Sequence, residues 1–74
     1  MTAPYRYRTL DGDPPTHAGY SFERDRAKRD AASIVIRTGL RLEFIDPNHG
    51  VFEVAPWTAK RARWIRVADV ERRA

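Results

Sequence analysis

The stretch of sequence that decides the fold is LRLEFIDPNHGVFEVA, residues 40–55. Apolar and charged residues alternate in its first part, so Leu40, Leu42 and Phe44 fall on one face of a strand. The middle of the stretch, residues 46–50, consists of residue types that favour turns. Alternation then resumes in residues 51–55. The stretch therefore predicts a β-hairpin.

The turn also predicts how the two strands of this hairpin pair. A three-residue loop that ends at Gly50 places glycine where a left-handed backbone is needed, and it pairs Phe44 with Val54. The neighbouring register would set Glu43 opposite Glu53, and like charges directly opposite each other destabilise a sheet. We therefore expect the register that pairs Phe44 with Val54.

A helix is predicted for residues 23–38, directly before the hairpin. Apolar or small residues recur there at the spacing of one helical face, namely Ala27, Ala31, Ile34, Val35 and Thr38. Gly39 follows at once, where a helix commonly ends on a residue with a left-handed backbone. The segment is expected to turn back into the hairpin at this glycine.

The segments at the two ends of the chain are predicted less directly. Residues 5–10 alternate aromatic and basic side chains, which indicates a short strand, and residues 19–22 are expected to pair back on it. Residues 63–68 are rich in residues that favour strands. As a strand this last segment would send Ile65 and Val67 inward and Trp64 and Arg66 outward. A helix over the same segment is the alternative that the sequence leaves open.

These elements predict an α+β fold, with a three- to four-stranded antiparallel sheet and one helix packed on its inner face. The chain has 74 residues and 8.6 kDa, so residues 1–74 are expected to form a single small domain with a small core. Its ends, residues 1–4 and 70–74, are expected to fray. Because the chain has no cysteine, disulfides and thiolate metal sites are excluded.

The charge of the chain restricts its partners. The formal net charge is +4, and twelve of the fourteen basic residues are arginine, since only Lys28 and Lys60 are lysine. Arginine suits phosphates and carboxylates, which favours nucleic acid or an acidic protein surface as partner. A GC-rich genome would produce the same arginine excess, so the position of the arginines must decide between these explanations.

The apolar runs are too short to cross a bilayer, and the first residues do not resemble a secretory signal. We therefore expect a soluble, cytoplasmic protein that does not act at a membrane.

No residue pattern indicates catalysis. His17 and His49 lie in different turns, and zinc sites need three or four ligands at set spacings. Glu43 and Glu53 are expected to be ordinary surface residues. The glycines are isolated from one another, which excludes a glycine-rich phosphate-binding loop. We expect no metal, no cofactor and no catalytic residue, and we expect that the chain is not an enzyme.

One segment combines cations with rings, and it is the candidate site. Residues 57–67 carry four basic residues and no acidic one, with two tryptophans among them. Such a surface is typical of nucleic-acid binding, because cations contact phosphates and rings accept bases. For Trp57 we expect a packing role at the rim of the core, with arginine on its ring; for Trp64 stacking and packing both stay open. The candidate binding residues are Lys60, Arg61, Arg63, Trp64 and Arg66, with Arg41 beside them.

The sequence thus favours a small, basic binding module. The first hypothesis is binding to the phosphate backbone of nucleic acid through the arginine- and tryptophan-rich strand near the C-terminus. The alternative is a protein-interaction module, such as a small regulator or inhibitor encoded by a mobile element, that docks on a larger protein or nucleoprotein. Assembly into a homo-oligomer is a variant of this alternative.

Overall fold

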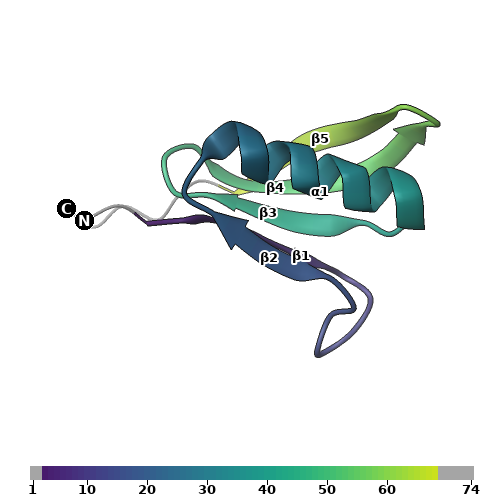
Figure 1. Ribbon diagram of the computed structural model, residues 1–74, viewed down its shortest axis with the longest axis horizontal. Coiled ribbons are helices and arrows are strands. Elements are labelled where there is room, and N and C mark those ends of the chain that lie inside the picture. The colour runs from purple at the N-terminus through teal and green to yellow at the C-terminus, as the bar shows by residue number, and fades with distance from the viewer. Residues whose placement is uncertain (1–2, 69–74) are drawn as a thin grey trace.

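The alternating and helical segments of the sequence form five strands and one helix in a computed structural model that describes residues 3–68. The elements are β1 (Tyr5–Thr9), β2 (Ala18–Ser21), α1 (Arg24–Thr38), β3 (Leu42–Asp46), β4 (Gly50–Thr58) and β5 (Arg61–Ala68). All neighbouring strands are antiparallel, and their order in the single sheet is β2-β1-β3-β4-β5. Figure 1 shows α1 lying along one face of this sheet. The predicted fraying of residues 1–2 and 70–74 lies outside the described residues.

The α+β class is confirmed, but the sheet has five strands and not three to four. The two segments that the sequence indicated weakly are its edge strands, β2 and β5. Each of them pairs with one neighbour only, β2 with β1 and β5 with β4. Pairing with a longer strand stabilises a segment whose local sequence is ambiguous, and for that reason the local pattern underestimated the number of strands.

Helix α1 follows the predicted spacing. Its buried residues are Ala27, Ala31, Ile34 and Val35, and they belong to one cluster with the buried side chains of the strands, which are Tyr5, Leu42, Phe44 and Val54. The helix ends at Gly39, whose φ of 74° is left-handed and whose N–H donates to the Val35 carbonyl at 2.9 Å. The predicted helical face and the glycine stop are both confirmed.

The predicted register of the β3–β4 hairpin is wrong, because each residue of β3 pairs with a residue of β4 two positions earlier than expected. Phe44 lies opposite Phe52, Leu42 opposite Val54, and Glu43 faces Glu53 directly. Glu43 and Glu53 can lie opposite each other because each carboxylate has an arginine partner, and the two arginines come from different segments of the chain. Arg8 Nε lies 3.2 Å from Glu43, and Arg41 Nη1 lies 3.2 Å from Glu53. These ion pairs, which are invisible in the local sequence, remove the repulsion that argued against the observed register.

Asp46 explains why the hairpin takes this register. Its side chain is 2% exposed, and its carboxylate accepts the backbone N–H groups of Asn48 at 2.8 Å and His49 at 3.1 Å. Asp46 pairs with Gly50, so the loop consists of the three residues between them. The predicted loop had the same length but began one residue later. The carboxylate also lies 3.5 Å from Arg24 Nε, which joins the loop to the start of α1.

Residues 61–68 form a strand, so the helical alternative is wrong. The predicted faces of this strand are also wrong. Trp64 lies opposite Val54, which is buried under α1, and Trp64 therefore faces the helix side. Ile65 and Val67, which were expected inside, are 39% and 56% exposed. A tryptophan buries more surface than an isoleucine, so the inward position of Trp64 gives the larger apolar gain.

The ionised Asp46 side chain is expected to stabilise the fold. Burial by itself raises the pKa of Asp46, but hydrogen bonds from Asn48 and His49 outweigh burial, and the net pKa lies below its ordinary value. A carboxyl whose pKa is lower in the folded state stabilises the fold above its unfolded pKa of about 3.9. This stabilisation is lost as the pH falls through the folded pKa.

Replacement of Asp46 tests this role. Asp46→Ala should lower the free energy of unfolding by about 1–3 kcal/mol at pH 7, because loop N–H groups lose their acceptor. The variant should also be less sensitive to acid than the original chain. Urea unfolding at pH 7 and at pH 3 measures both effects, and Asp13→Ala in an exposed loop is the control. Equal stability of Asp46→Ala and the original chain at pH 7 would contradict the role assigned to Asp46.

Candidate nucleic-acid interface

The β4–β5 hairpin extends beyond the rest of the sheet. The pairing of β3 with β4 ends at Leu42 and Val54, whereas β4 continues to Thr58. Beyond that point β4 pairs only with β5, through Ala55 with Arg63, Pro56 with Ala62, and Thr58 with Arg61. We call this two-stranded extension, residues 55–63, the ribbon. Pro56 suits it, because a proline that lacks an N–H is tolerated where a strand has a free edge.

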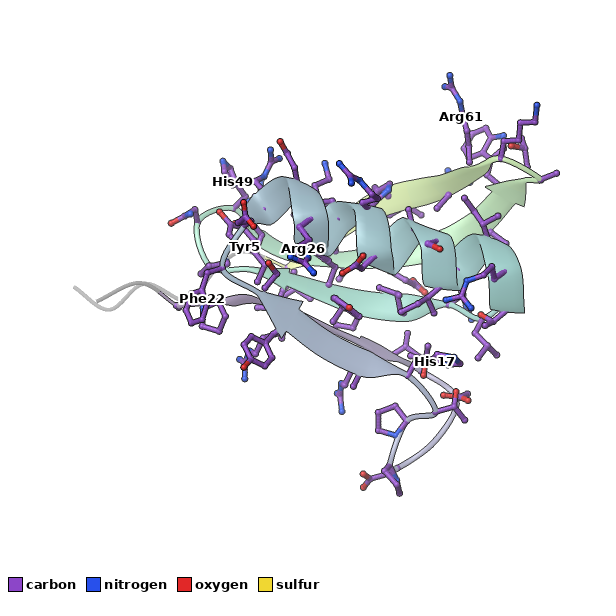
Figure 2. All side chains as sticks on the ribbon, viewed as in Figure 1. Tyr5, His17, Phe22, Arg26, His49 and Arg61 are labelled. Atoms are coloured by element: carbon purple, nitrogen blue, oxygen red, sulfur yellow. The ribbon has the colours of Figure 1, made fainter. Side chains whose placement is uncertain are left out.

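The ribbon is basic and contains no acidic residue. Its cations are Lys60, Arg61 and Arg63, and all three residues are exposed. In Figure 2, Arg61 lies at the outer end of the hairpin, and His49 marks the opposite end of the molecule. The ribbon thus brings together three of the six residues that the sequence predicted as a binding surface.

Trp57 is the aromatic residue of the ribbon, and it is 64% exposed. The guanidinium carbon of Arg63 lies 5.0 Å from the centre of its ring, a cation–π contact. The predicted arginine on this ring is confirmed, but the predicted place at the rim of the core is wrong, because the ring is largely exposed and β3 pairs with β4 only as far as Val54. A shallow depression of about 450 Å³ is lined by Trp57, Arg61, Ala62, Arg63 and Trp64.

Trp64 lines the same depression, but its ring is partly buried and packs against the core. Its ring is edge-to-face with Phe44, with 5.1 Å between the centroids, and Lys28 Nζ lies 5.0 Å from its centroid. The packing alternative for Trp64 is therefore the observed one. Strand pairing distinguishes the two tryptophans. Trp64 lies opposite Val54 and shares its face of the sheet, whereas Trp57 lies past the last residue of β4 that pairs with β3.

Arg41 and Arg66, the other two predicted residues, lie away from the ribbon. Arg41 is engaged by Glu53, so part of its charge is already neutralised within the sheet. Arg66 lies opposite Phe52, which places it on the helix side and not on the outer face where it was expected. The six predicted residues therefore do not form one surface, because they lie on both faces of the sheet and at the end of the β4–β5 hairpin.

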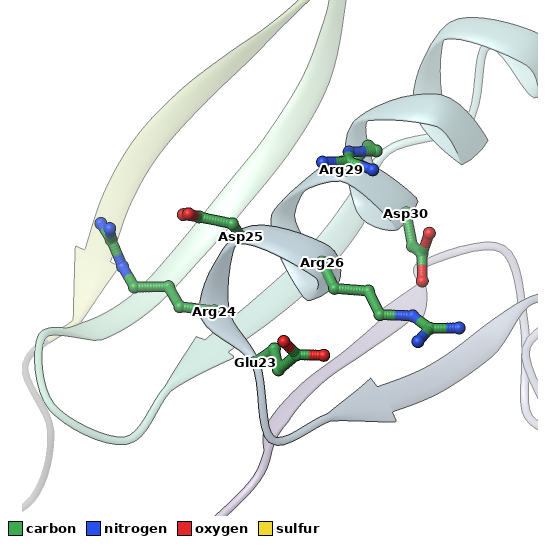
Figure 3. A pocket seen from close by; sticks show the side chains of 6 residues that line it. All are labelled: Glu23, Arg24, Asp25, Arg26, Arg29 and Asp30. Carbon is green, nitrogen blue, oxygen red and sulfur yellow. The ribbon is translucent and has the colours of Figure 1, made fainter.

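A second polar depression lies at the start of α1, and Figure 3 shows the six charged side chains around it. Three of these residues are basic and three are acidic, namely Arg24, Arg26 and Arg29 with Glu23, Asp25 and Asp30. Although Asp25 and Arg29, and likewise Arg26 and Asp30, are four residues apart on the helix, neither pair is among the ion pairs found in residues 3–68. Because its charges balance, this depression has no preference for an anionic partner.

The described part of the chain contains no group of three or more metal-ligating side chains of the His, Cys, Asp and Glu types. Within the same residues, no helix has the length and apolar character needed to span a bilayer. No protein-family model, curated protein or solved structure matches this chain.

The two tryptophans are expected to respond differently to truncation. Trp64→Ala should cost about 3 kcal/mol or more of unfolding free energy, because it leaves a cavity beside Phe44. Trp57→Ala should change stability by about 0.5 kcal/mol or less, since an exposed side chain leaves no cavity. Urea unfolding followed by far-UV circular dichroism measures both variants. Equal losses would contradict the assignment of Trp64 to the core and Trp57 to the surface.

Proposed function

We propose that this chain is a small, non-enzymatic module that binds nucleic acid through the phosphate backbone, with the ribbon as its contact surface. The observation that carries the proposal is the ribbon itself, which holds three exposed cations and no acid beyond the edge of the packed sheet. Cations on such a projection reach phosphates without desolvating the core. Each phosphate contact releases condensed counterions, and this release drives association.

The ion pairs of three other arginines argue against their positions as the contact surface. Arg8, Arg24 and Arg41 each lie within ion-pair distance of a carboxylate of the fold. In residues 3–68, by contrast, no ion pair involves the cations of the ribbon. Arg6, Arg26, Arg29 and Arg37 also have no ion pair within these residues, so the ribbon is favoured by its projection and by its lack of acidic residues in addition to this criterion.

Salt dependence tests the proposal. Three phosphate contacts predict a log–log slope of about −2.7 on duplex, so the affinity should fall about 40-fold between 50 and 200 mM salt. The variant Lys60→Ala/Arg61→Ala/Arg63→Ala should bind more weakly, and its slope should be smaller by about one unit for each contact removed. Fluorescence anisotropy with labelled oligonucleotides measures both quantities.

The matched control removes the same charge from α1, as Arg26→Ala/Arg29→Ala/Arg37→Ala. It should retain most of the affinity if the ribbon is the contact surface. If both triple variants lose affinity equally, net charge explains the binding and the ribbon is not the site.

A second candidate function is the docking of a protein partner with an acidic surface on the face of the sheet that α1 leaves uncovered. Ile65 is exposed on this face, and the arginines Arg6 and Arg63 lie on it as well. Apolar side chains beside arginine are typical of protein interfaces. A partner held mainly by apolar contacts would respond far less to salt, so the same titration separates the two candidates.

A further inference from the structure

The dimensions of the ribbon indicate which kind of nucleic acid it fits. Neighbouring strands lie about 4.8 Å apart, and the major groove of B-form DNA is about 12 Å wide and about 8.5 Å deep. From Ala55 to Thr58 the ribbon rises about 10 Å, at roughly 3.3 Å per residue. The ribbon is therefore narrow enough to enter this groove and long enough to reach its floor.

The side chains of the ribbon keep it narrow. Apart from the cations, Trp57 and Thr58, its residues are small, namely Ala55, Pro56, Ala59 and Ala62. Its cations lie at the turn and along β5, where phosphates on either side of a groove would meet them. The minor groove is only about 6 Å wide, which is too narrow for two paired strands that also carry a tryptophan.

The small number of aromatic rings in the ribbon argues against single strands as partner, and the shape of the A-form groove argues against duplex RNA. Trp57 is the one aromatic residue between positions 55 and 63, and Arg63 lies over its ring. Proteins that bind single strands stack successive bases on several rings, whereas the ring of Trp64 is partly buried against Phe44 and leaves Trp57 as the one largely exposed ring of this region. The major groove of A-form RNA is too deep and narrow for side chains to read.

We infer, on the basis of the proposed function, that the partner is B-form duplex DNA and that the ribbon enters its major groove. Arg61 and Arg63 then lie along the groove with Lys60 at its leading end, and Trp57 lies against the groove wall.

The first test compares three labelled probes of one sequence, roughly 20 units long so that they span about two helical turns: duplex DNA, duplex RNA and single-stranded DNA. The intact chain should bind duplex DNA about tenfold more tightly than either of the others at 50 mM salt. Methyl green, which occupies the major groove, should displace the protein, whereas the minor-groove binder netropsin should not.

A steric variant makes the test independent of charge. Ala59→Phe enlarges the exposed turn of the ribbon without changing its cations, so it should weaken binding to duplex DNA about tenfold and leave single-strand binding unchanged. Ser33→Phe adds the same ring to an exposed position of α1 and should have no effect on either probe. Circular dichroism of both variants confirms that they fold.

The outcomes separate this inference from the proposed function. If duplex DNA binds no more tightly than single strands, or if netropsin alone competes, the major-groove inference is overturned. If Lys60→Ala/Arg61→Ala/Arg63→Ala still weakens binding to all three probes in that case, the proposed function stands without groove entry. If the intact chain binds none of the probes at 50 mM salt, both the inference and the proposed function are overturned.

Discussion

The carboxylate of Asp46 accepts two N–H groups of the following loop, and the rest of the sheet depends on this contact. It closes a three-residue loop and sets Asp46 opposite Gly50, so that Val54 pairs with Leu42. Val54 in turn lies opposite Trp64. Because side chains alternate along a strand, the position of Trp64 under α1 determines that Arg63 points away from it. The pairing of Trp64 with Val54 thus places Arg63 on the face of the sheet that α1 leaves uncovered.

The different positions of Trp64 and Trp57 follow from the point at which the pairing of β3 with β4 ends. Trp64 lies opposite Val54, which also pairs with β3. Its ring packs against the core, and in a domain of this size each aromatic side chain is a large part of that core. Trp57 lies past the end of the pairing with β3 and is largely exposed, and the Arg63 side chain lies over its ring. The ribbon can therefore carry exposed basic and aromatic side chains without weakening the packed part of the sheet.

Much of the fold could be predicted from local patterns, because those patterns report local physics. The spacing of Ala27, Ala31, Ile34 and Val35 indicated the buried face of α1, and Gly39 indicated its end. The candidate site was predicted only in part. Its cations are evident from composition, but their faces depend on which side of β5 packs on the core, and the pairing of Trp64 with Val54 decides this. The like charges of Glu43 and Glu53 led to the wrong register because their arginine partners come from β1 and from the residue before β3.

The sequence by itself determined the α+β class, the helix with its glycine stop, the hairpin around residues 46–50 and the basic, acid-free stretch near the C-terminus. These properties depend on residue type and on spacing within a few positions. Only the tertiary structure decided the number of strands, the loop register, the inward position of Trp64 and the projection of residues 55–63 beyond β3. The reason is physical: these features arise from contacts between segments distant in the chain, where ion pairs and buried area outweigh local preference.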